Sequence, residues 1–330
     1  MRNLRGIAGA WAAAATVGLV LAAPVAGQSA AASSGTTVTQ LPVRYSGHRY
    51  FVTPVLETGD TLELYTDTGG GANMLWQGTA ERLGLDGEWL RQGDDSMKIV
   101  AFPPMRAGAA IPLPAAPPPV GERFLVVDSK DFPEGDGFLS RSWFADRVWL
   151  FNYPAQTLAQ VEGPAPSLAP EHRSPLAFQT DSAGRRTTHF PRITAVVDGD
   201  TLDLLFDTGA TTTLSDSALA ALGDGGPARR ATSFITRTVF ERWQAAHPDW
   251  RVIKGADAIG NAPMIEVPRV TIAGHEVGPV WFTGRADQAF QEYMAQWMDR
   301  PIDGALGGSA LRYFRVLVNY PEGYAEFATD

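Results

Sequence analysis

The sequence of 330 residues contains no cysteine, which excludes disulfides, a lipoprotein anchor and thiolate metal sites. It also has no cluster of Lys or Arg, and its formal charge is −9 with a pI near 5.1. That balance argues against nucleic acid or an anionic membrane surface as a partner. The five histidines are His48, His172, His189, His247 and His275. Their spacing is not that of metal ligands, so we expect no metal site and no cofactor.

The N-terminus has the composition of an export signal. Arg2 and Arg5 precede an uncharged stretch rich in Ala, Val and Leu, which ends in the small residues Val25-Ala26-Gly27. This pattern is typical of a cleaved secretory signal. The alternative is an uncleaved membrane anchor, because about 20 apolar residues can span a bilayer. We therefore expect a signal peptide over residues 1–27, a periplasmic or secreted protein, and contact with a membrane only if this segment stays uncleaved.

The tripeptide Asp-Thr-Gly occurs twice, as Asp67-Thr68-Gly69 and Asp207-Thr208-Gly209, with matching flanks over eleven residues at an offset of 140 (207 − 67). Each copy follows an alternating segment that is typical of a strand running into a Gly turn. One such tripeptide carries little information, whereas a duplicate with matching flanks indicates an internal repeat. Two carboxylates brought face to face can share one proton and hold a water molecule between them.

A second repeated block closes each half of the chain. Residues 136–144 correspond to residues 303–311, and the match continues to Asn152-Tyr153-Pro154 and Asn319-Tyr320-Pro321 at an offset of 167 (319 − 152). The larger offset places an insertion of 27 residues (167 − 140) in the middle of the second half. The length also suits two domains, at about 100–200 residues each. We predict an N-terminal lobe over 40–153, a linker rich in Pro, Ala, Gly and Ser over 154–187, and a C-terminal lobe over 188–330.

Local patterns predict a few individual elements. Alternation over residues 49–64, broken at Thr58-Gly59-Asp60, predicts a β-hairpin. Apolar residues at three- and four-residue steps predict helices over 72–85, 236–247 and 287–298. Residues 30–39 are small and polar, and we expect a loose leader there.

The two motifs together resemble the pepsin–retropepsin clan of aspartic peptidases, and most closely the bacterial retropepsin-like proteins whose single chain holds two related halves. Three features carry the resemblance: Asp-Thr-Gly in both halves after hydrophobic residues, the strand Ala305-Leu306-Gly307, and the closing segment 306–316. The matches span residues 49–327, although the middle of each half is covered only by the order of its elements.

The resemblance implies an all-β fold with a few helices, bilobal and pepsin/retropepsin-like, with pseudo-two-fold symmetry and an active site between the lobes. Asp67 and Asp207 would be the catalytic pair of an aspartic endopeptidase acting on a peptide or protein substrate. Thr68 and Thr208 would hydrogen-bond across to the opposite loop. Gly69 and Gly209 would let backbone N–H groups approach the carboxylates. One chain would supply both lobes, so we expect a monomer.

The sequence also departs from the family pattern. Ser140 stands where the family has Gly, Gly70 and Ala210 stand where pepsin-like enzymes place Ser or Thr, and no Tyr between Tyr65 and Tyr153 is available as a flap residue. Without a hydroxyl at the positions after Asp-Thr-Gly, the pair should keep its shared proton to higher pH. Two alternatives stay open: a catalytically silent relative that binds peptides or proteins in the same cleft, and a peptidase that is active only as an assembly.

Overall fold

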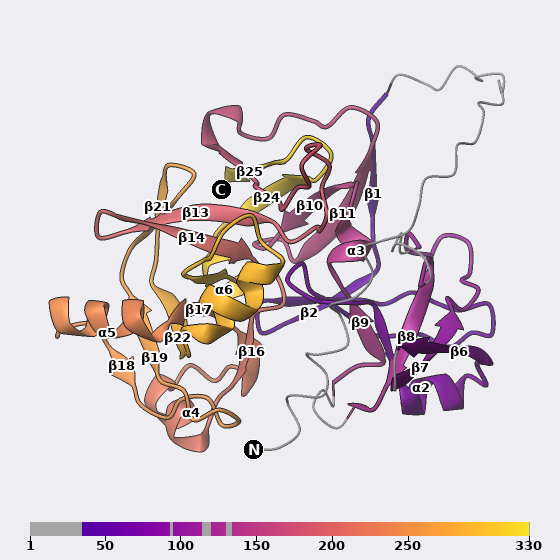
Figure 1. Cartoon of the computed structure of the whole chain (residues 1–330), viewed down its shortest axis with the longest axis horizontal. Coiled ribbons are helices and arrows are strands. Elements are labelled where there is room, and N and C mark those ends of the chain that lie inside the picture. Colours follow the sequence, from indigo (N-terminus) through magenta and orange to yellow (C-terminus); the bar gives the residue numbers. More distant parts are fainter. Residues whose placement is uncertain (1–34, 93–94, 114–119, 130–133, 330) are drawn as a thin grey trace.

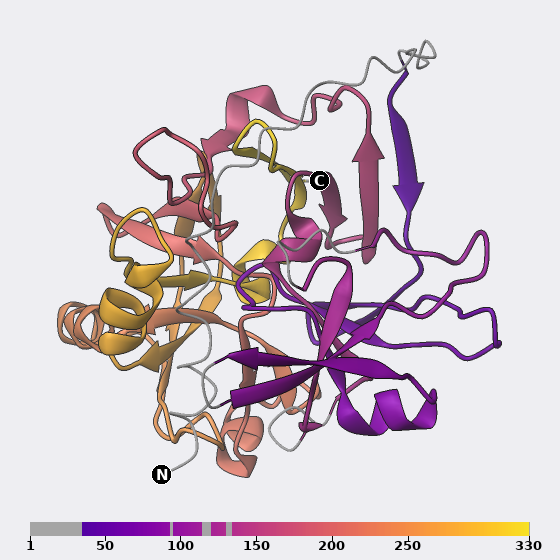
Figure 2. The same cartoon turned by 45° about the vertical axis from the view of Figure 1, so that its right-hand side comes forward.

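A computed structural model describes residues 35–92, 95–113, 120–129 and 134–329. The protein is built mainly from short β-strands with a few short helices, as the all-β prediction requires. In Figure 1 the first half of the chain, indigo to magenta, and the second half, orange to yellow, occupy opposite sides of the molecule. Figure 2 shows the same separation after a turn of 45°.

The first half forms an eight-stranded sheet in the order β2-β3-β4-β9-β5-β8-β7-β6. Its strands are β2 (Val43–Ser46), β3 (Arg49–Val52), β4 (Leu64–Thr66), β5 (Met74–Trp76), β6 (Gly87–Gln92), β7 (Asp95–Ala101), β8 (Arg123–Val127) and β9 (Gly137–Leu139). Strands β3 and β4 pair antiparallel, so the predicted hairpin is confirmed.

The second half forms a nine-stranded sheet in the order β18-β19-β22-β17-β23-β14-β13-β20-β21. Its strands are β13 (Arg192–Val197), β14 (Asp200–Phe206), β17 (Ser233–Thr236), β18 (Val252–Ile253), β19 (Met264–Val267), β20 (Val270–Ile272), β21 (His275–Val277), β22 (Val280–Arg285) and β23 (Gly304–Leu306).

The two sheets repeat one topology. The order β3-β4-β9-β5-β8-β7-β6 of the first half matches β13-β14-β23-β17-β22-β19-β18 of the second. The directions match too: β4 with β9 and β14 with β23 are parallel, as are β5 with β8 and β17 with β22. The remaining pairs along both series are antiparallel. The repeat in sequence is therefore a repeat in structure.

A third, six-stranded sheet joins the halves in the order β1-β11-β10-β24-β25-β12. Its strands are β1 (Thr37–Gln40), β10 (Val148–Asn152), β11 (Thr157–Glu162), β12 (Arg173–Pro175), β24 (Arg315–Asn319) and β25 (Tyr324–Ala328). All but β12 are labelled in the upper part of Figure 1. At its centre Leu150 pairs with Leu317, its own counterpart at offset 167. Equivalent residues facing each other in an antiparallel pair indicate a local two-fold axis at this point.

Two predicted loose segments carry strands of this sheet. Thr37–Gln40, at the end of the expected leader, pairs with β11. The expected linker over 154–187 contains β11 and β12, which pair with β10 and β25. The prediction missed β1 and β12 because their flanks are rich in Pro and Gly and their partner strands lie far away in the sequence. Strand β11 pairs with the adjacent β10 across a short turn.

The helices agree with the sequence only in part. The predicted helix over 72–85 is wrong at its start: Met74–Trp76 is strand β5, held between β8 and β9, and only Gln77–Arg82 is helix α2. Helix α5 (Arg237–Ala246) confirms the prediction over 236–247. In the segment 287–298 the chain forms two irregular helical turns, η4 (Ala289–Tyr293) and η5 (Met294–Gln296).

Most of the insertion in the second half directly follows the second Asp-Thr-Gly. Strand β5 begins at Met74, close behind Asp67, whereas β17 begins only at Ser233. The added segment holds β15 (Thr211–Thr213), helix α4 (Asp216–Leu222) and β16 (Arg229–Ala231). Ser215 caps α4 by accepting the N–H of Ala218, and Gly223 ends it with a left-handed backbone.

The remaining helical segments are short: η3 (Pro170–His172), α3 (Arg141–Phe144) and α6 (Gly308–Leu311). Within the described ranges, no helix is long and apolar enough to cross a membrane. The predicted signal peptide, residues 1–27, lies outside those ranges.

Candidate active site

The two Asp-Thr-Gly turns lie against each other. Asp67 follows β4 and its N–H donates to the carbonyl of Leu139 at 2.8 Å, while Asp207 follows β14 and its N–H donates to the carbonyl of Leu306 at 3.0 Å. Leu139 and Leu306 end the parallel neighbours β9 and β23, which begin at the glycine of the repeated Asp-Gly pair. Each half therefore holds its aspartate in the same way, at the end of a strand that is hydrogen-bonded to its parallel neighbour in the sheet.

The threonines lock the turns reciprocally. The N–H of Thr68 donates to Oγ1 of Thr208 at 3.2 Å, and the N–H of Thr208 donates to Oγ1 of Thr68 at 3.0 Å. The Thr68 hydroxyl donates to the carbonyl of Phe206 at 2.7 Å, and that of Thr208 to Thr66 at 3.5 Å. This exchange of equivalent contacts indicates a second point on the local two-fold axis. Each threonine hydrogen-bonds to the opposite turn, the arrangement that the resemblance implies.

The glycines do more than present their N–H groups. The N–H of Gly69 donates to Oδ1 of Asp67 at 2.8 Å and that of Gly209 to Oδ1 of Asp207 at 2.9 Å. In addition, a Cβ on Gly69 would lie 2.6 Å from Cγ of Asp207, and one on Gly209 would lie 1.9 Å from Cγ of Asp67. Each carboxyl thus rests on the glycine of the opposite turn, a steric role that sequence reasoning missed.

The two carboxyls behave as one titrating pair. Burial raises the pKa of both Asp67 and Asp207, and for Asp67 the negative charge of Asp207 raises the pKa further. A hydrogen bond between the two side chains requires one of the two carboxyls to be protonated. Like charges this close resist joint ionisation, so the pair holds one proton over a range above the ordinary carboxyl pKa.

The glycine-rich turn after Asp67 is held by a cation. Arg141, the first residue of α3, donates from its guanidinium to the carbonyls of Gly70, at 3.0 Å, and Gly71. The same guanidinium lies over the ring of Phe190, 4.2 Å from the ring centroid, a cation–π contact with the second half. Burial lowers the pKa of Arg141 to about 10, which leaves it charged at neutral pH.

The two departures at Gly70 and Ser140 lie in different surroundings from their counterparts in the second half. In the second half the corresponding pair is Ala210 and Gly307, where a Cβ on Gly307 would lie 2.6 Å from Cβ of Ala210 and 2.0 Å from the carbonyl oxygen of Thr232. In the first half a Cβ on Gly70 would instead meet the ring of Phe138, at 2.5 Å. Phe138 therefore excludes a side chain at Gly70, whereas the main chain of Thr232 and Ala210 exclude one at Gly307.

Ser140 is integrated by a local hydrogen-bond network. Its N–H donates to Oδ1 of Asn73 at 2.8 Å, and its hydroxyl lies 3.3 Å from the same oxygen and 3.2 Å from the hydroxyl of Ser142. In the second half the N–H of Gly307 donates to the hydroxyl of Ser233 at 3.1 Å. A side-chain oxygen on the neighbouring segment thus performs the same task in both halves.

Tyr65, two residues before Asp67, reaches the opposite turn. Its hydroxyl donates to the carbonyl of Gly209 at 2.8 Å and lies 2.7 Å from the hydroxyl of Thr211. Burial raises the pKa of the Tyr65 phenol, and the charge of Asp67 raises it further. The phenol is therefore neutral over the working range of the pair.

A small cavity of about 10 Å³ lies beside Tyr65, room for about one water molecule. Arg49 is 2% exposed and donates to the carboxylate of Glu134 at 2.8 Å and to the carbonyl of Arg229 in the second half at 2.9 Å. The cavity is lined by Arg49, Phe51, Tyr65, Trp76, Glu134, Phe138 and Arg229.

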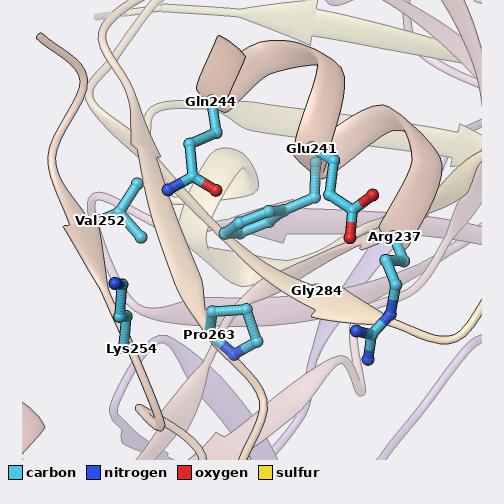
Figure 3. A pocket seen from close by; sticks show the side chains of 8 residues that line it. Arg237, Glu241, Gln244, Val252, Lys254, Pro263 and Gly284 are labelled. Carbon is cyan, nitrogen blue, oxygen red and sulfur yellow. The ribbon is translucent and has the colours of Figure 1, made fainter. Parts of the chain in front are cut away.

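A larger hollow of about 210 Å³ lies between α5 and the strands β18 and β22 (Figure 3). Arg237 and Lys254 stand on opposite sides of it, and Glu241 and Gln244 project from the helix above. Its charged lining is exposed, and neither Asp67 nor Asp207 takes part. The paired carboxyls interact electrostatically, and Asp207 is buried while Asp67 is partly buried, so they are the stronger functional candidate.

Among the described residues, no group of three or more His, Asp or Glu side chains is arranged to hold a metal ion. Comparison with protein-family models and with curated proteins finds no match. The candidate site therefore rests on the geometry of the two turns and on the motifs in the sequence.

Proposed function

We propose that the protein is an aspartic endopeptidase, a hydrolase that cleaves peptide bonds with a water molecule activated between Asp67 and Asp207. The observation that carries this proposal is the reciprocal contact of the two turns, in which each carboxyl lies on the glycine of the other. Two carboxyls that share one proton supply a base and an acid at a single position. Their location between two halves of equal topology supports the resemblance to the pepsin–retropepsin clan.

The reaction follows from these two roles. The ionised carboxylate removes a proton from the water, whose oxygen attacks the scissile carbonyl carbon. The protonated carboxyl gives its proton to the carbonyl oxygen, so a neutral gem-diol forms. On collapse, a diol proton returns to one carboxylate, the amide nitrogen takes a proton from the other carboxyl, and the C–N bond breaks. The free acid and amine leave, and the pair again holds one proton.

The direct test replaces each aspartate by asparagine. We expect Asp67→Asn and Asp207→Asn each to lower kcat/KM on a fluorogenic peptide library by at least about 10³-fold, because each variant lacks the acid–base pair. Asp200→Asn is the matched control, since Asp200 begins β14 but its carboxylate is exposed and pairs with Arg242 at 2.8 Å. Equal residual cleavage by the wild type and both site variants would contradict the proposal.

The same experiment separates the two alternatives. A catalytically silent relative would bind library peptides or a pepstatin-type inhibitor without cleaving any of them. The bracing of Gly70 and Gly71 by Arg141, and the fit of Ser140, weaken the case for silence that the sequence left open. An enzyme active only as an assembly would lose activity on dilution, whereas a monomer with both turns on one chain would keep its turnover number.

We propose further that the protein acts in the periplasm or outside the cell, on peptides or proteins. This proposal rests on the export pattern of residues 1–27. The test is to express the full chain and a variant in which Arg2 and Arg5 are replaced by Glu. Export predicts a shortened mature protein in the periplasmic or extracellular fraction for the wild type, and retention of the longer precursor for the variant.

A further inference from the structure

The two halves of the candidate site differ at the position two residues before the aspartate. The first half has Tyr65 there, and the second half has Leu205. Only the tyrosine has a hydroxyl, and it donates across the boundary between halves to the carbonyl of Gly209 at 2.8 Å. The hydroxyl of Thr211 lies 2.7 Å from the phenol oxygen. The turn of Asp207 is therefore braced from the opposite half.

This brace acts on a peptide unit that contacts Asp207. In a trans peptide the C=O and the N–H point in opposite directions, and the carbonyl of Gly209 shares its peptide plane with the N–H of Ala210. That N–H faces Asp207, donating to its main-chain oxygen at 3.2 Å and also stabilising the ionised side chain. A hydroxyl that fixes the carbonyl end of the plane also fixes its N–H end.

The turn of Asp67 is braced differently. Its support comes from Arg141 of the same half, which holds the carbonyls of Gly70 and Gly71, whereas the counterpart of Arg141 in the second half is Gly308. The two aspartates therefore share one backbone design but have unequal surroundings. Such inequality is what gives one member of a carboxyl pair the charge and the other the proton.

We propose that Tyr65 is a positioning residue that makes Asp207 the charged base of the pair and leaves Asp67 as the acid. The proposal rests on the proposed function for its catalytic consequence. Tyr65 would act through the Gly209–Ala210 peptide, holding the N–H of Ala210 on Asp207. Loss of the hydroxyl would free this peptide to rotate and would reduce the difference between the two carboxyls.

The other titratable groups near the pair do not replace Tyr65 in this role. Tyr153 and Tyr320 are buried, which raises their pKa and keeps them neutral. The guanidinium of Arg49 lies 5.6 Å from the centroid of the Tyr65 ring and is engaged with Glu134. Arg141 holds the other turn. Among these groups, Tyr65 is the one that donates a hydrogen bond to the carbonyl of Gly209.

The test is Tyr65→Phe, which removes the hydroxyl and keeps the ring. We expect kcat to fall about tenfold, the effect of one hydrogen bond of about 1.4 kcal/mol, with KM within twofold because the Tyr65 side chain is buried. The acidic limb of the kcat/KM profile should move to higher pH by about half a unit to one unit, since the Asp207 anion is less stabilised. Tyr50→Phe is the matched control: Tyr50 is 1% exposed and its hydroxyl has no hydrogen-bond partner among the described residues.

A second measurement separates this inference from the proposed function. Carbon-13 NMR of labelled aspartates reports which carboxyl ionises first, whether or not the protein cleaves peptides. We expect Asp207 to ionise at lower pH than Asp67 in the wild type and in Tyr50→Phe, with a smaller difference in Tyr65→Phe. If Tyr65→Phe fails to fold, Thr211→Val, which keeps the Tyr65–Gly209 bond but removes its neighbour, should shift Asp207 in the same direction by less. An unchanged order and spacing of the two titrations in the folded variant, or Asp67 ionising first in the wild type, would overturn the inference.

Discussion

Substitution of Gly209 by alanine is the sharpest test of the geometry between the two turns. The new Cβ would lie 1.9 Å from Cγ of Asp67, whereas ordinary van der Waals contacts begin at 3.4 Å. The carboxyl of Asp67 must therefore retreat by about 1.5 Å, the difference between these two distances. At Gly69 the corresponding distance to Cγ of Asp207 is 2.6 Å, which requires a shift of only about 0.8 Å.

These shifts predict unequal losses of activity. A misplacement of about 1 Å at a reacting group costs roughly 10²-fold in rate. We expect Gly209→Ala to lower kcat/KM by more than about 100-fold and Gly69→Ala by about tenfold. Overpacking should also destabilise the fold by about 1–3 kcal/mol, offset in part by the lower entropy of the unfolded chain, worth about 0.4–1 kcal/mol.

Steady-state hydrolysis of a fluorogenic peptide, combined with urea unfolding of each variant, measures both effects. Gly71→Ala is the control, because its nearest neighbour, a nitrogen of Arg141, would lie 3.9 Å from the added Cβ. This variant should keep activity within about threefold of the wild type. Full activity in folded Gly209→Ala, or a greater loss in Gly69→Ala, would refute the reasoning.

Four further outcomes follow from the same region. Asp67→Asn should raise the melting temperature at neutral pH. Burial raises the pKa of Asp67 above its ordinary value of 3.8, so the wild type loses stability as the pH rises above that value, whereas the asparagine variant does not. The gain in melting temperature should vanish below about pH 4. The wild type should have a mildly acidic to near-neutral optimum, and Ala210→Ser should move the pH–rate profile toward acid, since an added hydroxyl can stabilise the carboxylate. Gly70→Ala should destabilise the protein by about 1–3 kcal/mol in urea unfolding, because its Cβ would lie 2.5 Å from the ring of Phe138. Gly307→Ser should be worse, since its Cβ would lie 2.0 Å from a main-chain oxygen, which cannot swing aside as a ring can.

The contacts between equivalent residues could be predicted from the sequence because they depend on the repeat. A constant offset places Thr68 opposite Thr208 and makes the two aspartates neighbours whenever the halves face each other. The offset of 167 likewise agrees with the pairing of Leu150 and Leu317. Such contacts follow from symmetry alone and need no knowledge of the side chains around them.

The contacts that break the symmetry could not be predicted in this way. Arg141 lies 70 positions from Gly71 along the chain, and nothing local indicates that a helix-initiating arginine will hold a distant turn. Ser140 looked unfavourable because its hydrogen-bond partner, Asn73, lies 67 positions away along the chain. The strand Met74–Trp76 was mistaken for helix because its apolar residues suit either structure, and its partners β8 and β9 come much later in the sequence.

The six-stranded sheet has a consequence for how the molecule folds. Strand β10 pairs with β24, and β12 pairs with β25. These pairs can form only after residues 315–328 have been synthesised, so this sheet cannot assemble until nearly the whole described chain is available. Contacts of such long sequence separation slow folding, because a large loop must close before any hydrogen bond forms. The nascent first half would leave β10 unpaired on the side that β24 later covers, and unpaired edges invite aggregation. A chaperone that shields the region around β10 until residues 315–319 emerge should raise the yield of native protein.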